Sequence, residues 1–125
     1  MPTTITNNIF TLRLNEKGYY ELEVKDKVEI NIAEIELIKA AQKEVSGKRL
    51  PTLVSGSLFS TTNIETLKYI SKNVNMPYSK ASAFILSSVP QKVLGNFYLK
   101  FYKPERPTKF FNSKEEALEW IAQFI

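Results

Sequence analysis

The sequence predicts a single α/β domain of 125 residues, with a mostly parallel sheet, an N-terminal antiparallel hairpin and four helices. Two observations predict this class. Strand patterns of period two alternate with helix patterns of period 3.6 along the chain, and helix-capping residues stand where the helical patterns begin. Strands that alternate with helices favour parallel pairing through right-handed crossovers. The predicted order is ββαβαβαβα, and we expect residues 1–8 to be a flexible N-terminus.

The first three elements are a hairpin and a helix. Apolar and polar side chains alternate over residues 10–14 and again over residues 20–24, which predicts two strands with one solvated face. Asn31 is followed three positions later by Glu34, as in a capping box, and apolar residues then recur at helical spacing. Gly47 marks the end of this helix, so we expect it to run from about residue 32 to residue 46.

The next strand and helix follow directly. Residues 51–57 predict a short strand that runs into a hydroxyl-rich loop. Asn63 is a good N-cap for the second helix. Its expected apolar stripe consists of Ile64, Leu67, Ile70 and Val74.

The last four elements complete the alternation. Residues 81–87 are apolar and small, which suits a central strand covered by helices. Pro90 can occupy the first turn of a third helix, and Pro104 ends it. Residues 108–111 predict the last strand, and Ser113, followed three residues later by a glutamate, caps a terminal helix.

A series of motifs between residues 94 and 121 supports this order. It consists of a glycine and aromatic residues, then Lys103-Pro104, then Pro-Thr-Lys-Phe-Phe at 107–111, then Glu-Glu-Ala-Leu-Glu-Trp at 115–120. The series resembles the C-terminal part of uncharacterised bacterial proteins described as STAS or SpoIIAA-like. Theirs is the fold of anti-sigma-factor antagonists, with a remote likeness to CRAL-TRIO lipid-transfer domains. The resemblance implies this fold over nearly the whole chain, 1–125, as one domain.

The resemblance also implies a position for a phosphorylation switch. In anti-sigma-factor antagonists an Asp-Ser pair stands at the start of the helix after the third strand, and its serine is phosphorylated. The matching pair here is similar in place but is Asn63-Ile64. Because isoleucine has no hydroxyl group, we expect no phosphoswitch at this position.

Composition argues against most catalytic chemistry. The chain has no histidine and no cysteine, and Asp26 is its only aspartate. It therefore lacks the usual general base at neutral pH, the thiolate nucleophile and the common ligands of transition metals. We expect a protein that is not an enzyme, with no catalytic residues, no metal site and no cofactor, and keep a hydrolase as a distant alternative.

No apolar run approaches the roughly 20 residues of a transmembrane segment. The first residues lack the charged and apolar regions of a secretory signal, so we expect a cytoplasmic protein without a transmembrane segment.

Basic residues concentrate in the middle of the chain. The net charge is +4, and residues 51–110 hold eight basic residues against two acidic ones. Such a region suits phosphate, an anionic membrane or an acidic partner, although lysines that merely solvate the surface explain it equally.

The third helix offers the first candidate site, because its aromatic residues exceed what one short helix needs for packing and lysines flank them. The alternative is that the aromatic residues belong to the core and the lysines to the solvated surface. The candidate residues for binding a partner or ligand are Phe97, Tyr98, Phe101, Tyr102, Lys92, Lys100 and Lys103.

The loop before the second helix offers another candidate site. Its hydroxyl groups could accept phosphate, and the backbone amides at the helix start could hold a small anion. Serine and threonine before a helix also serve as caps and turn formers. The candidate residues are Ser57, Ser60, Thr61, Thr62 and Asn63.

Together these features predict a regulatory or scaffold module that binds a protein partner, a second copy of itself or an apolar ligand. The chief alternative is a lipid-binding or membrane-surface domain of the CRAL-TRIO-like type. Basic and aromatic residues also interleave between Lys92 and Phe111, but no nucleic-acid-binding motif accompanies them, so we do not expect nucleic acid as a partner.

Overall fold

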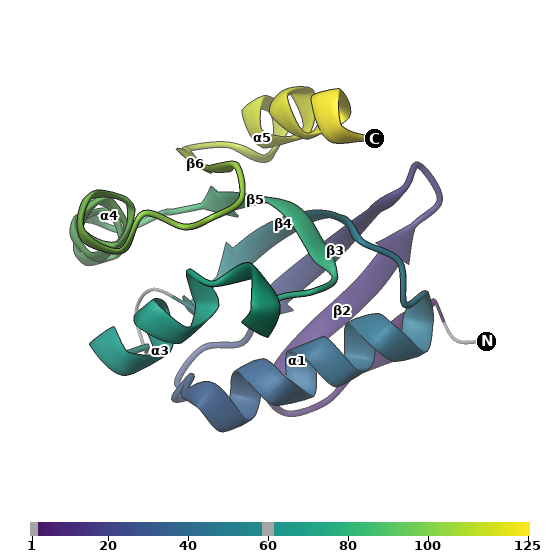
Figure 1. Ribbon diagram of the computed structural model, residues 1–125, viewed down its shortest axis with the longest axis horizontal. Helices are drawn as coiled ribbons and strands as arrows, with labels where there is room; N and C mark the ends of the chain where they lie inside the picture. Colours follow the sequence, from purple (N-terminus) through teal and green to yellow (C-terminus); the bar gives the residue numbers. More distant parts are fainter. Residues whose placement is uncertain (1–2, 59–61) are drawn as a thin grey trace.

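A computed structural model describes residues 3–58 and 62–125 as an α/β fold with a six-stranded mixed sheet (Figure 1). The strands are β1 (Thr4–Thr6), β2 (Phe10–Asn15), β3 (Tyr19–Val24), β4 (Leu50–Gly56), β5 (Ser79–Ile85) and β6 (Thr108–Phe111). The described residues form four α-helices, α1 (Ile32–Val45), α3 (Ile64–Ile70), α4 (Val89–Phe97) and α5 (Lys114–Ile121). A π-helix over Tyr98–Tyr102 follows α4, and 3-10 turns cover Asn73–Asn75 and Ala122–Phe124.

The strands lie in the sheet in their order along the chain, from β1 to β6. The first three are antiparallel, and β3, β4, β5 and β6 are parallel to one another. The predicted fold class, with its hairpin and four helices, is therefore confirmed. One element differs from the expectation, because Thr4–Thr6 pair with β2 as an edge strand where we expected a flexible N-terminus over residues 1–8.

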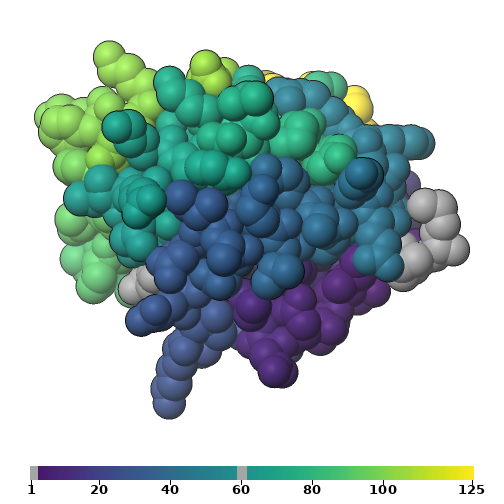
Figure 2. Space-filling view, turned by 60° about the horizontal axis from the view of Figure 1, so that its bottom comes forward, coloured from purple at the N-terminus to yellow at the C-terminus, as the bar shows by residue number. Residues whose placement is uncertain are grey.

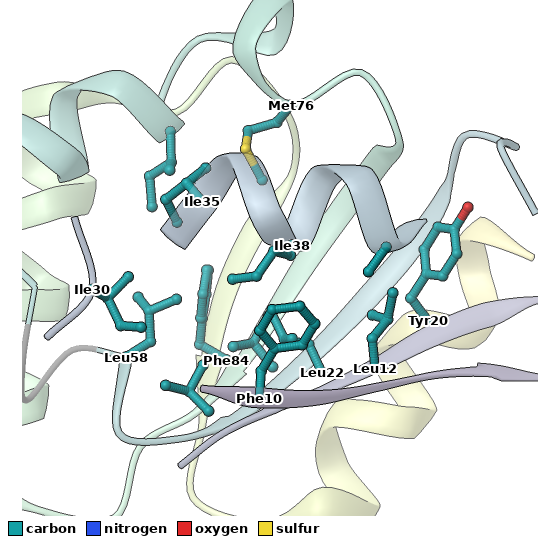
Figure 3. Close-up of a cluster of buried hydrophobic side chains, with 14 of the residues drawn as sticks. Phe10, Leu12, Tyr20, Leu22, Ile30, Ile35, Ile38, Leu58, Met76 and Phe84 are labelled. Atoms are coloured by element: carbon teal, nitrogen blue, oxygen red, sulfur yellow. The ribbon is translucent and has the colours of Figure 1, made fainter. Parts of the chain in front are cut away.

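Helices cover both faces of the sheet (Figure 1). The larger core lies between the sheet and α1, α3 and α4, where Phe10, Leu22 and Phe84 from the strands meet Ile35 and Ile38 from α1 (Figure 3). The smaller core lies beneath α5 on the opposite face. Its buried residues are Tyr19, Leu53, Ala83, Phe111, Ala117 and Ile121.

Side-chain caps fix the helix starts, as the sequence predicted. The Asn63 Oδ1 atom accepts a hydrogen bond from the Thr66 amide at 2.8 Å. The Ser113 Oγ atom accepts one from the Glu116 amide at 3.3 Å. Ser88, directly before α4, caps that helix in the same way, so α4 begins at Val89 with proline in its first turn.

A buried arginine joins the last strand to three other elements. Arg106 is 4% exposed. Its Nη2 atom donates to the Ile70 carbonyl oxygen at 2.6 Å, at the end of α3, and its Nε atom donates to Ser82 Oγ of β5 at 3.1 Å. Its Nη1 atom donates to Asn73 Oδ1 at 3.4 Å, in the 3-10 turn that follows α3. Arg106 thereby holds α3, this turn and β5 against the start of β6.

Tyr98 belongs to the larger core, which corrects its place among the candidate binding residues. Its side chain is fully buried. Burial raises the pKa of the Tyr98 hydroxyl to about 12, although the nearby Arg106 charge acts in the opposite direction. The sequence could not show this, because aromatic residues stand on both sides of this helix and only the packing distinguishes them.

The end of β4 requires glycine, which predicts a large effect of one methyl group. Gly56 has φ +88°, and a Cβ atom there would lie 2.0 Å from the Val24 carbonyl oxygen of the neighbouring strand. We expect Gly56→Ala to lower the free energy of unfolding by at least about 3 kcal/mol, measured by urea denaturation. Gly47→Ala is the control, since its φ is also positive but its Cβ would have 3.4 Å of room. Similar losses in both variants would show that backbone strain alone, and not the contact with β3, determines the cost.

The burial of Tyr98 predicts a sharp difference from the neighbouring aromatic residue Phe101. We expect Tyr98→Ala to lower the free energy of unfolding by about 3–5 kcal/mol, because it removes a fully buried ring. Phe101→Ala should change it by less than about 1 kcal/mol, because this ring is 60% exposed. Urea denaturation of both variants checks this, and equal losses would contradict the described packing.

The raised pKa of Tyr98 also predicts a dependence of stability on alkaline pH. A tyrosine whose pKa rises from 10.0 to about 12 on folding is kept protonated by the folded state. The contribution of this hydroxyl group to the free energy of unfolding is complete below pH 10 and is lost as the pH rises toward 12. We therefore expect the stability of the wild type to fall by about 2 kcal/mol relative to that of Tyr98→Phe over this range, measured by urea denaturation at each pH. A difference that stays constant would contradict the buried hydroxyl.

Candidate functional site

Large apolar side chains are exposed where the start of α3 lies beside α4. The exposed fractions are 55% for Ile64, 73% for Val89 and 64% for Val93. These three, with Pro90, Leu94 and Phe97, line an open depression of about 520 Å³, and we call these six residues the α4 surface. In Figure 2 the teal surface of α3 lies between the blue surface of α1 and the green surface at the left.

Tight packing on the other side of α4 explains why this ridge faces outward. Gly95 is buried against the sheet, and a Cβ atom there would lie 2.9 Å from Leu86 and 3.0 Å from Phe110. The helix therefore approaches the sheet closely along Gly95. Val89 and Val93, which lie four residues apart on a different side, are left in solvent.

Aromatic rings extend the α4 surface toward the π-helix. The ring centroids of Phe97 and Phe101 are 4.6 Å apart, and those of Phe97 and Tyr102 are 5.7 Å apart. Phe101 is exposed, whereas Tyr102 is partly buried against the larger core. Of the four aromatic residues in the sequence hypothesis, only Phe101 is thus exposed, Phe97 and Tyr102 are half-buried, and Tyr98 is buried.

The predicted lysines lie on or near the same helix. Lys92 and Lys100 are exposed, and the Lys100 Nζ atom lies 5.6 Å from the centroid of the Phe101 ring. Lys103 is also exposed and ends the π-helix with a left-handed backbone, φ 44°. Lys92 and Lys100 therefore lie on the same two helical segments as the exposed side chains of Val89, Val93 and Phe101.

Ile64, Val89 and Val93 are not among the site residues that the sequence pattern predicts. Ile64 was expected in the apolar stripe of the second helix, but only Leu67 and Ile70 of that stripe are buried. The four-residue spacing of Val89, Val93 and Phe97 was the available signal. It could not be interpreted alone, since apolar residues also stand on the side of α4 that faces the sheet.

The loop candidates have structural roles where the structure describes them. Ser57 is buried, and its Oγ atom donates a hydrogen bond to Asp26 Oδ1. Thr62 forms a parallel bridge with Ile30, and Asn63 caps α3. Ser60 and Thr61 lie outside the described residues.

A second concavity, of about 510 Å³, lies on the opposite face of the sheet beside α5. Glu21 lies in it, with Arg13 Nε donating to Glu21 Oε2 at 2.8 Å and Lys114 Nζ 3.4 Å from Oε1. Partial burial alone would raise the pKa of Glu21, but these two cations hold it below its usual value. The carboxylate is thus kept ionised within a network of charges.

The described residues contain no cluster of three or more histidine, cysteine, aspartate or glutamate side chains that could bind a metal ion. Within the same ranges, no helix combines the length and apolar character needed to cross a bilayer.

Comparison with known proteins supports the fold and identifies the family. No curated protein matches the chain. Among solved structures, it is similar to an uncharacterized protein of the DUF3478 family with a SpoIIAA-like fold from Shewanella loihica PV-4. The TM-score is 0.50 at 14% identity, over 94% of this chain and 98% of the other. The SpoIIAA-like resemblance seen in the sequence is therefore confirmed as a likeness of fold. The model of the domain of unknown function DUF7793 matches residues 14–125, and the chain belongs to that family.

Proposed function

We propose that this domain is a non-enzymatic binding module that recognises a protein partner through the α4 surface. The observation that supports it most directly is the contiguous set of apolar side chains there, in which Ile64, Val89 and Val93 are exposed and Leu94 and Phe97 are half-buried. Exposed apolar residues scattered singly are ordinary, whereas a gathered set of this kind is typical of interaction sites.

The geometry of the surface suits a protein more than a small ligand. The depression is open and shallow, and its lining is almost entirely apolar. Small-molecule sites are usually concave, with a few polar groups that fix the orientation of the ligand. A broad ridge with few polar groups instead favours side chains that pack over a larger area.

The chemistry of the described residues also favours binding over catalysis. The chain lacks histidine and cysteine. Glu21, the carboxylate in the other concavity, has a lowered pKa and is bound by Arg13 and Lys114. A general acid near neutral pH needs a raised carboxyl pKa, so this group is poorly suited to that role.

Binding to lipid or to a membrane surface is the second candidate. The observation that favours it is the position of Lys92 and Lys100 beside an exposed apolar ridge, since helices at a bilayer surface combine these two features. A photoreactive probe in place of Val93 can distinguish the two candidates, because a protein partner would give a protein adduct and a membrane would give a lipid adduct.

Site-specific photocrosslinking can test the proposal. We expect a photoreactive amino acid in place of Val93, in the full chain in its host cells, to give discrete protein adducts on denaturing gels. The matched control is the same probe at Val74, which is apolar and 83% exposed but does not line the α4 surface.

Equal adduct patterns at positions 93 and 74 would contradict a specific protein site. Lipid adducts at position 93, detected by intact mass and accompanied by cosedimentation with anionic vesicles, would support the membrane alternative instead. Urea denaturation of both probe variants would verify that they are folded.

A further inference from the structure

The exposed ridge of α4 has the spacing with which helices pack against one another. Val89, Val93 and Phe97 stand four residues apart, and the contact between Phe97 and Phe101 continues the row. Rows of side chains four residues apart are the ridges that fit into the grooves of a neighbouring helix. In this row Val89 and Val93 are exposed and Phe97 is half-buried, and the depression between the row and Ile64 provides a groove beside it.

The next row around α4 is polar and positively charged. Lys92, Asn96 and Lys100 are also four residues apart, and all three are exposed. In a helix this row lies directly beside the apolar ridge, on the side away from Pro90 and Leu94. An element packed on the ridge would therefore have two lysines along one of its edges.

We propose that the partner element is an amphipathic helix that packs along the α4 surface, with acidic residues on the edge that faces Lys92 and Lys100. The proposal rests on the proposed protein-binding function and specifies its partner. The four-residue spacing of the apolar side chains on α4 favours a helical partner. The row of lysines favours acidic residues on the facing edge of that partner by charge complementarity.

A second copy of this chain fits the surface less well. In an antiparallel two-fold pairing of α4 with itself, the lysine rows of both copies would lie on the same side and repel each other. In a parallel pairing, each lysine row would instead face the apolar side of the other copy that contains Pro90 and Leu94. Neither arrangement supplies carboxylates opposite Lys92 and Lys100.

The test combines the photocrosslinker at position 93 with charge reversal. We expect Lys92→Glu with Lys100→Glu to reduce the yield of the protein adduct by about tenfold, because both changes place like charges opposite the acidic edge. The matched control is Lys17→Glu with Lys48→Glu, two exposed lysines elsewhere on the surface, which changes the net charge equally. The control should leave the yield within about twofold of the unmodified chain.

Mass spectrometry of the crosslinked peptide provides the second readout. Attachment to a partner segment with apolar residues at helical spacing and aspartate or glutamate along one edge would support the proposal. Attachment to a segment without that pattern, or an adduct yield that the reversal of Lys92 and Lys100 leaves unchanged, would overturn it. In either case the proposed protein-binding function would still stand. If position 93 gave no protein adduct at all, both the protein-binding function and the helical partner would be overturned.

Discussion

The buried Arg106 guanidinium is the interaction on which the arrangement of the parallel half of the domain depends. Burial of a charge is costly unless hydrogen bonds surround it, and burial lowers the pKa of Arg106 accordingly. Its acceptors are a carbonyl oxygen at the negative end of α3, a serine hydroxyl on β5 and the side-chain oxygen of Asn73 in the turn after α3. Each of these elements must be in place before the charge is satisfied. The adjacent Glu105 strengthens the junction, since its amide donates to the Ser71 carbonyl oxygen and its carboxylate accepts from the Asn73 amide.

This junction connects the core to the candidate binding surface. Tyr98 is fully buried near the Arg106 charge, and Gly95 lies against Leu86 and Phe110, so two neighbouring positions fix the rotation of α4 about its own axis. Once that rotation is fixed, the row that contains Val93 can only face solvent. The exposed ridge is therefore a consequence of how the opposite side of the helix packs, and a protein partner could rely on a rigid surface there.

The sequence predicted the fold well because its signals are local. The caps at Asn63 and Ser113 and the alternation in the hairpin each depend on residues a few positions apart, and all were confirmed. The strand at Thr4–Thr6 escaped prediction because three residues are too few for a periodic signal. The candidate site was predicted only in part. The sequence indicated a binding surface on the helix that carries the exposed ridge, but it could not tell that Tyr98 faces the core and Val93 faces solvent, because that depends on Gly95, Arg106 and the sheet.

The order of the strands in the sheet also determines how the domain can assemble during synthesis. Because β1 to β6 lie side by side in their order along the chain, each strand that leaves the ribosome meets an edge formed by the strand before it. The sheet can therefore be extended in one direction, because no later strand has to insert between two strands that are already paired. The edge of β5 stays unpaired until β6 arrives, and an unpaired edge is the part of a sheet most prone to aggregation. Arg106 emerges directly before β6, so the strand that covers the edge of β5 and the residue that locks α3 to the sheet reach the nascent domain together.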